Sequence, residues 1–153
     1  MIQTLKKALI SSLLFLFISS FTADDGDKII GLWEPSNGKA RIKIEKIGSK
    51  YYGKIVWLKE PLDATTNAPK LDKNNPDESM RNVPLKGYRM LKDFIYNEKN
   101  EWKEGTIYDP ESGSLYSCVI NMKDENTLDI RGYVGVKALG RTDVWKRLMV
   151  NKK

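Results

Sequence analysis

The sequence contains no histidine and a single cysteine, Cys118. Without histidine, the chain cannot build a histidine-based catalytic triad or the usual zinc and copper sites. One cysteine cannot form a disulfide within the chain, so the hydrophobic core has to hold the fold. Cys118 shares one face of a strand-like run with Tyr116 and Ile120. We expect a packed small side chain there rather than a reactive thiol, because no histidine is present to activate it.

Long apolar runs are missing from the chain after its first 23 residues. Within those residues, two lysines precede an apolar run over residues 8–21 that ends in small side chains, the pattern of a secretory signal peptide. The run is short for a helix that spans a bilayer. We therefore expect a signal peptide at residues 1–23, cleaved after Thr22 or Ala23, and an exported periplasmic or secreted protein with no transmembrane segment in the mature chain. No cysteine lies near the cleavage site, which argues against a lipid anchor.

The remaining residues, 24–153, are enough for one domain that buries roughly two-thirds of its unfolded surface. Two of the 26 basic residues and none of the 20 acidic residues precede this domain, which leaves a net charge of +4. The basic residues are scattered, as on solvated strand faces, and do not form a stripe. The sequence therefore indicates no binding of nucleic acid.

Alternation of apolar and polar residues recurs along this domain, and sustained helical spacing is found nowhere in it. The alternating runs cover residues 29–34, 39–47, 51–58, 87–97, 101–109, 114–122, 127–136 and 142–149. Most of the joints between them are short and rich in Asn, Gly, Asp and Pro, as in hairpin turns. The pattern predicts an all-β protein, an eight-stranded antiparallel meander closed into a barrel, with a β-sandwich as the competing architecture. Side chains could fill such a barrel, or one small ligand could occupy it.

The first and last strands of the domain carry residues that are expected to meet in a closed barrel. Gly31-Leu32-Trp33 lies on the first strand, and Arg147 lies on the last. If the barrel closes, these strands meet, and a guanidinium stacked on the Trp33 indole would seal that end. Gly-x-Trp covered by a basic residue of the final strand resembles the arrangement in lipocalins and their calycin relatives. The alternative is that Trp33 is only a core aromatic residue.

Further motifs are spread over nearly all of residues 30–148. They are Tyr52-Gly53-Lys54-Ile55-Val56-Trp57-Leu58, Asn75-Pro76-Asp77 with Arg81 and Pro84-Leu85-x-Gly87, Trp102-x-x-Gly105-x-Ile107-Tyr108-Asp109-Pro110, Leu128-x-Ile130-Arg131-Gly132-Tyr133 and Gly140-Arg141-Thr142-x-x-Trp145-x-Arg147. With these motifs the chain resembles the bacterial domain-of-unknown-function family number 2147, small exported proteins. The resemblance implies a lipocalin-like barrel without an assigned activity.

One connection, residues 59–86, is far longer than a hairpin needs. Its segment after Pro76 could form a helical turn with Asn75 as the N-cap. In a purely structural interpretation, Arg81 ties this loop to a carboxylate such as Asp72 or Asp109, and Leu85 packs into the barrel mouth. The preceding strand is apolar on both faces, with Trp57 aligned with Tyr51 and Ile55 on one of them. We therefore also expect the loop to cover the outer side of that strand.

The functional interpretation uses polar residues of this loop and of three strand ends. We expect them to converge at one rim and to bind the polar or anionic group of a small apolar or amphipathic molecule whose apolar part enters the barrel. The candidate residues are Asp77, Arg81, Tyr108, Asp109, Arg131, Tyr133 and Arg141. This hypothesis rests on fold analogy and on the density of polar residues.

Two other functions remain open at this point. Alternation places Arg131 and Tyr133 on the face opposite Leu128 and Ile130, which suits a protein-interaction module of the cell envelope with a filled barrel and no ligand. The third alternative is a hydrolase or lyase in which Asp72 or Asp77 pairs with Asp109 as acid and base. The sequence predicts no catalytic set, no cofactor and no metal site.

Overall fold

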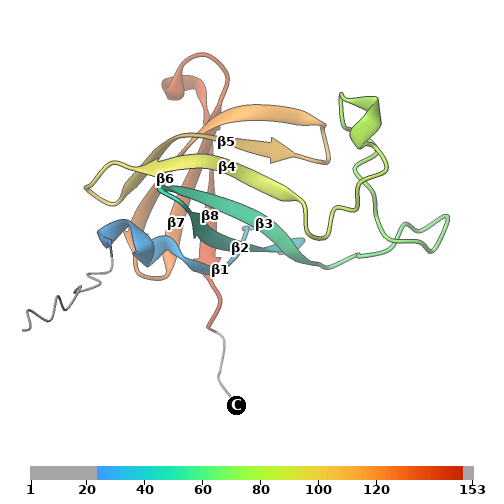
Figure 1. Cartoon of the computed structure of the whole chain (residues 1–153), viewed down its shortest axis with the longest axis horizontal. Helices are drawn as coiled ribbons and strands as arrows, with labels where there is room; N and C mark the ends of the chain where they lie inside the picture. The colour runs from blue at the N-terminus through green and yellow to red at the C-terminus, as the bar shows by residue number, and fades with distance from the viewer. Residues whose placement is uncertain (1–23, 150–153) are drawn as a thin grey trace, which may run out of the picture.

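The computed structural model describes residues 24–149, which form a closed barrel of eight antiparallel strands in chain order (Figure 1). The strands are β1 (Gly31–Glu34), β2 (Ala40–Ile47), β3 (Lys50–Leu58), β4 (Arg89–Tyr96), β5 (Glu101–Asp109), β6 (Ser114–Asp124), β7 (Thr127–Tyr133) and β8 (Arg141–Arg147). Short 3-10 helices are η1 (Asp25–Ile29), η2 (Glu78–Met80) and η3 (Lys137–Leu139). The predicted fold class is confirmed, and the β-sandwich alternative is wrong. The signal peptide expected at residues 1–23 lies outside the described residues.

Several strand boundaries differ by one to three residues from the sequence prediction, and two of the differences have a clear local cause. The first strand begins at Gly31 rather than at residue 29, because Asp24 caps η1 by accepting a hydrogen bond from the backbone N–H of Gly26. The seventh strand ends at Tyr133, because Gly135 takes a positive φ of 72° and the chain turns into η3. Within residues 24–149, no helix is long and apolar enough to cross a bilayer.

The barrel closes where β1 pairs with β8, with Trp33 opposite Arg147. Trp33 is fully buried, and its indole N–H donates to the carbonyl of Ile29 at 2.9 Å. The guanidinium of Arg147 lies 4.2 Å from the ring centroid of Trp33 and donates hydrogen bonds to three backbone carbonyls, those of Lys28, Ile30 and Glu125. This cluster seals one end of the barrel, which we call the closed end.

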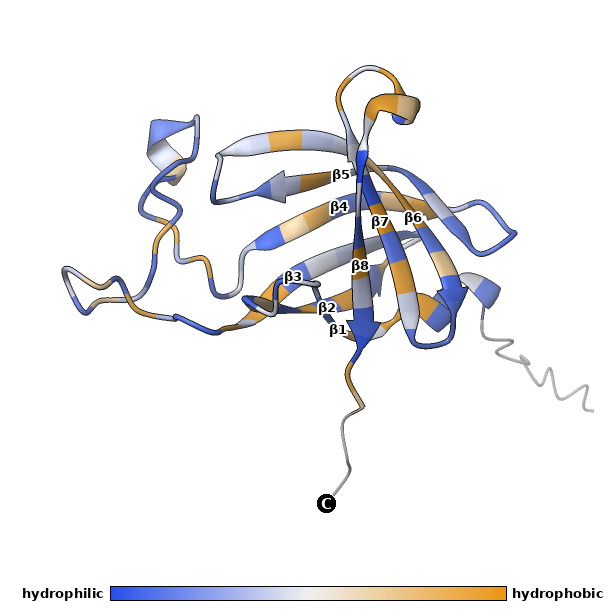
Figure 2. Ribbon diagram, turned by 180° about the vertical axis from the view of Figure 1, so that it is seen from behind, coloured by the Kyte–Doolittle hydropathy of each residue, from blue (hydrophilic) through white to orange (hydrophobic). Residues whose placement is uncertain are grey.

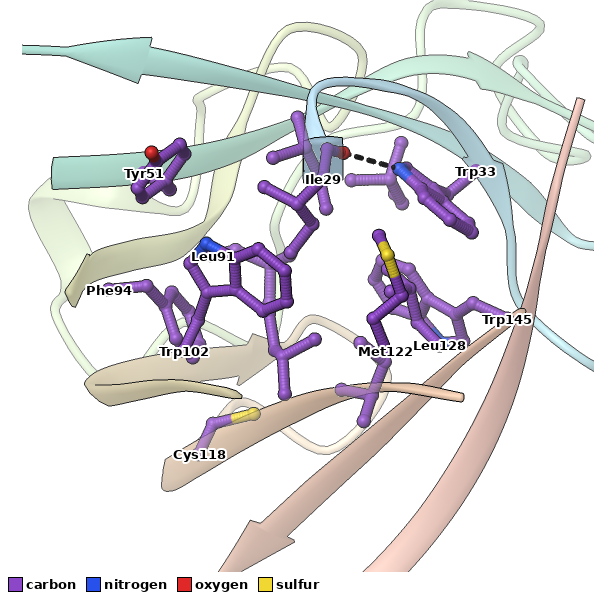
Figure 3. Packing of buried hydrophobic residues seen from close by; sticks show 14 of the residues in the cluster. Ile29, Trp33, Tyr51, Leu91, Phe94, Trp102, Cys118, Met122, Leu128 and Trp145 are labelled. Carbon is purple, nitrogen blue, oxygen red and sulfur yellow. Dashed lines mark hydrogen bonds between the residues drawn. The ribbon is translucent and has the colours of Figure 1, made fainter. Parts of the chain in front are cut away.

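Large aromatic side chains fill the closed half of the interior (Figure 3). The fully buried side chains include Trp33, Trp102, Trp145, Tyr51 and Phe94. Their packing needs glycine on the facing strands. A Cβ atom at Gly105 would lie 2.4 Å from the Phe94 ring, and one at Gly53 would lie 2.7 Å from Leu91. Cys118 lies buried in the same core, as predicted.

A bulge in β3 overturns the prediction made for Trp57. Arg41 pairs with Trp57, while the next residue of β2, Ile42, pairs with Ile55, so Val56 is an extra residue in β3. The extra residue turns Trp57 away from the face of Ile55. Trp57 is 36% exposed, and the guanidinium of Arg41 lies 4.4 Å from its ring centroid.

Candidate ligand-binding site

The end of the barrel opposite Trp33 is hollow. A cavity of about 1320 Å³ opens there between the strand ends, the long β3–β4 connection and the β7–β8 loop. The two loops project from different sides of this end in Figures 1 and 2. Apolar side chains from six strands line its inner part: Ile42, Ile55, Met90, Ile107, Ile130 and Trp145. The interior is therefore filled at the closed end and open at the other, an arrangement that lies between the two predicted alternatives.

Charged side chains surround the mouth of this cavity, and most of them are paired with one another. Lys39 and Glu111 form an ion pair at 2.6 Å, as do Lys73 and Asp63. Lys70 lies 3.6 Å from Glu60. The amine of Lys73 and two backbone N–H groups hold the pKa of the Asp63 carboxyl well below its ordinary value. These exposed pairs shape the rim and contribute little to stability individually.

Polar groups on the inner face of β8 lie at the mouth of the cavity. Arg141 pairs with Gly132, and Asp143 pairs with Ile130, so both side chains share the inward face of β8 with Trp145. The Asp143 carboxylate accepts a hydrogen bond from the Trp145 indole at 2.8 Å. All of these residues line the cavity, which is therefore apolar inside and polar at its entrance.

The long connection is fastened to the barrel by a buried polar contact. Asp72 is 1% exposed and accepts hydrogen bonds from the Tyr108 hydroxyl at 2.8 Å and from the Asn75 side chain at 2.7 Å. Burial, together with the Asp72 carboxylate, raises the pKa of Tyr108, so the phenol remains a donor at neutral pH. This contact holds Leu71 and Leu85 against the cavity, where both line its wall.

The helical turn predicted in this connection is present, but its details differ. Asp77, not Asn75, caps η2 by accepting from the backbone N–H of Ser79 at 2.9 Å. The expected contact of Arg81 with Asp72 or Asp109 is not formed. The Arg81 side chain instead donates to the backbone carbonyl of Asn75 at 2.8 Å and pairs with Glu78. The Asp77 carboxylate and the Arg81 guanidinium therefore bind groups within the turn and its flanking residues, and not groups of the barrel.

The seven candidate residues do not meet at one rim. Tyr108, Asp109, Tyr133 and Arg141 line the cavity. Asp77 and Arg81 flank η2 and are absent from the lining. Arg131 donates to the carbonyls of Lys137 and Ala138 and to the Thr142 hydroxyl, which fixes the β7–β8 loop.

Sequence reasoning missed Tyr116 and Asp143 as lining residues. Alternation along the strands could have identified them, because Tyr116 shares a face with the core residue Cys118, and Asp143 shares a face with the core residue Trp145.

The carboxylates considered for acid and base catalysis have structural contacts. Asp109 accepts hydrogen bonds from the backbone N–H of Glu111 at 2.9 Å and from the Ser112 hydroxyl at 2.7 Å, which shapes the β5–β6 turn. Asp72 anchors the long connection and Asp77 caps η2. In the described part of the chain, no three acidic or cysteine side chains come together as metal ligands.

The β7–β8 loop exposes apolar side chains beside the mouth. Val134, Val136 and Leu139 are 74%, 60% and 80% exposed, and the loop projects from the barrel with several hydrophobic positions (Figure 2). Val134 and Leu139 also contribute to the cavity lining. Apolar side chains gathered on a projecting loop are a feature of interaction surfaces.

Comparison with known proteins supports the fold and places the chain in a family. No curated protein matches the sequence. Among solved structures, HP1028 from the human pathogen Helicobacter pylori, which belongs to the lipocalin family, is similar with a TM-score of 0.68 and 25% sequence identity. The similarity covers 78% of this chain and 82% of HP1028. The profile of a family described as uncharacterised protein conserved in bacteria, DUF2147, matches residues 31–147. The chain therefore belongs to the DUF2147 family, as its motifs indicated, and has a lipocalin-like barrel.

Proposed function

We propose that this protein is an exported carrier or sensor that binds one small apolar or amphipathic molecule in the open end of its barrel. The observation that carries the proposal is the cavity of about 1320 Å³, whose inner wall is apolar and whose entrance is polar. Sites for small molecules usually combine a concave apolar wall with a few polar groups that orient the ligand. The chain's membership of a family with a lipocalin-like barrel is compatible with this function.

Export is the second part of the proposal. Its support is the pattern of residues 1–23, two lysines followed by an apolar run and small residues. Amino-terminal sequencing of the protein recovered from the periplasm or the medium tests this part. A first residue at Ala23 or Asp24 supports export and cleavage, whereas recovery of the uncleaved chain from the cytoplasm contradicts them.

A cavity-filling substitution tests the binding site. Ile107 lines the cavity, so Ile107→Trp adds volume where the apolar part of a ligand would lie, whereas Ile47→Trp adds the same ring at a side chain that is 46% exposed near the closed end. A neutral fluorescent probe such as N-phenylnaphthylamine should bind the unchanged protein and Ile47→Trp, and should bind Ile107→Trp at least tenfold more weakly. Circular dichroism verifies that both variants fold. Equal probe binding by both variants would contradict the proposed site.

A second function is favoured by the β7–β8 loop. The exposed side chains of Val134, Val136 and Leu139 suit a protein-interaction module of the cell envelope. Cross-linking in intact cells tests it with the full chain and with Leu139→Ser, which removes apolar surface while the exposed site tolerates a polar residue. A specific cross-linked envelope protein that is lost in Leu139→Ser supports this function. Recovery of no envelope component, or an unchanged pattern in the variant, argues against it.

A further inference from the structure

We propose that the ligand is an anionic amphiphile whose head group is held by Arg141, with its apolar chain directed toward Ile130 and Trp145. This inference rests on the proposed function, because it identifies the class of molecule that the cavity takes. It concerns a single head group at the entrance, such as the carboxylate of a fatty acid.

The position of Arg141 gives it access to such a head group. Arg141 is the first residue of β8 and pairs directly with Gly132, whose strand neighbours on the inward face are Ile130 and Leu128. Paired residues of antiparallel strands share a face, so Arg141 lies on the inner side of the barrel at its mouth. Its side chain lines the cavity and remains exposed to solvent. Because Gly132 has no side chain, β7 contributes nothing at this level that would displace the guanidinium.

The balance of charge around the cavity leaves Arg141 available. The acidic side chains of the lining each have a donor: Glu60, Asp63 and Glu111 face lysines, Asp109 binds its own turn, and Asp143 accepts the Trp145 indole. Three of the four lysines in the lining are neutralised in those same pairs, and the fourth, Lys59, lies beyond the end of β3 on the long connection. Among residues 24–149, Arg141 makes no ion pair and no side-chain hydrogen bond. A planar guanidinium with several N–H donors then faces the entrance without an acceptor, and a carboxylate fits its geometry.

Tyr116 supplies a second donor on the other side of Gly132. A Cβ atom built at Gly132 would lie 3.6 Å from the Cβ atom of Tyr116, while Arg141 is the β8 partner of the same glycine. Tyr116 lines the cavity, and within the described residues its hydroxyl has no hydrogen-bond partner. The two side chains therefore flank one position at the mouth, above the apolar wall formed by Ile107 and Ile130.

Asp143 lies two residues from Arg141 on the same face and is the group that could favour a cation instead. Its Oδ2 atom already accepts the Trp145 indole N–H at 2.8 Å, and Trp145 is 2% exposed, so this oxygen is held by a core residue while the carboxylate keeps its charge. Because Arg141 and Asp143 carry opposite charges on one face, comparing an anionic with a cationic ligand tests directly whether the guanidinium determines the preference.

The experiment compares three ligands with the same chain length: dodecanoate, dodecanol and dodecylammonium, below their aggregation concentrations. Titration calorimetry measures their affinities for the unchanged protein, Arg141→Gln and Arg89→Gln. Arg89 is the matched control, because its guanidinium is exposed over the Tyr52 ring at 5.0 Å and does not line the cavity. A charge-assisted hydrogen bond predicts that dodecanoate binds about 10- to 100-fold more tightly than dodecanol. Arg141→Gln should abolish that difference by lowering the affinity for dodecanoate, whereas Arg89→Gln should preserve it.

Each other result overturns the inference in a distinguishable way. Equal affinities for dodecanoate and dodecanol, tighter binding of dodecylammonium, or a preference for dodecanoate that survives in Arg141→Gln would refute the role of Arg141 while leaving the carrier function in place. Failure of all three ligands to bind the unchanged protein would refute the inference and the proposed function together.

Discussion

Replacing Arg147 with alanine should destabilise the protein much more than replacing Arg41, although each guanidinium stacks on an indole. The two stacks are similar in geometry, with centroid distances of 4.2 Å over Trp33 and 4.4 Å over Trp57. They differ in burial, since Trp33 is fully buried and Trp57 is 36% exposed. Comparing Arg147→Ala with Arg41→Ala therefore isolates the effect of burial on a guanidinium–indole stack.

The magnitudes follow from the partners of each guanidinium. Arg147 joins the first and last strands and donates to three carbonyls, at 2.6 Å, 2.6 Å and 2.9 Å. Charge-assisted bonds and a stack on a buried ring, reduced by the cost of partial desolvation, correspond to a net loss of about 3 kcal/mol on truncation. Arg41 pairs with Glu34 at 3.2 Å on a solvated surface, so its truncation should cost about 0.5–1 kcal/mol.

Urea unfolding at 25 °C, followed by circular dichroism, measures both free energies of unfolding. Arg147→Ala should lose about 2 kcal/mol more than Arg41→Ala, and Arg147→Lys should recover only part of the loss because lysine lacks the planar fork of donors. Equal losses for Arg147→Ala and Arg41→Ala would refute the view that the stack on Trp33 closes the barrel.

Three further predictions concern the core, the long connection and the thiol. Gly105→Ala places a methyl group against the Phe94 ring, so the free energy of unfolding should fall by about 1–3 kcal/mol in urea titrations. Tyr108→Phe removes a donor from the buried Asp72 carboxylate, so the free energy of unfolding should fall by about 1–3 kcal/mol and proteolysis of the β3–β4 connection should become faster. Burial raises the pKa of Cys118 to about 12, so iodoacetamide at pH 8 should modify the thiol rapidly only after addition of urea.

Each of these predictions has its own check. Gly132→Ala is the control for the core, since its Cβ atom would find Ile107 no closer than 3.4 Å and the cost should stay below about 1 kcal/mol. Tyr52→Phe is the control for the connection, because its hydroxyl binds the exposed Asp93 and its loss should change stability by less than about 0.5 kcal/mol. Equal costs within either pair, or rapid modification of the folded thiol, would contradict the described packing.

The fold could be predicted from the sequence because alternation and turn residues report local geometry. Hairpin joints fix neighbouring strands, and the meeting of Gly31-Leu32-Trp33 with Arg147 follows once the barrel closes. Trp57 shows where this reasoning fails: one extra residue in β3 reverses the faces beyond it, and neither composition nor period marks the bulge.

The site was harder to predict because its polar residues are sorted by contacts between distant segments. Arg131 and Arg141 lie in the same region of the sequence, yet the outward face of β7 places Arg131 under the β7–β8 loop, and the register with Gly132 places Arg141 inside the mouth. Similarly, the bond between Tyr108 and Asp72 spans 36 residues and determines which part of the long connection reaches the cavity. Such pairings carry no local signature in a single sequence.

The proposed function requires the open end of the barrel to hold a small molecule. The first measurement is native mass spectrometry of the protein expressed with residues 1–23 in place, compared with the same sample after denaturation. We expect a mass excess of one small molecule per chain that disappears on denaturation. A bare chain under the same mild conditions, together with no gain in mass after incubation with dodecanoate, would contradict it.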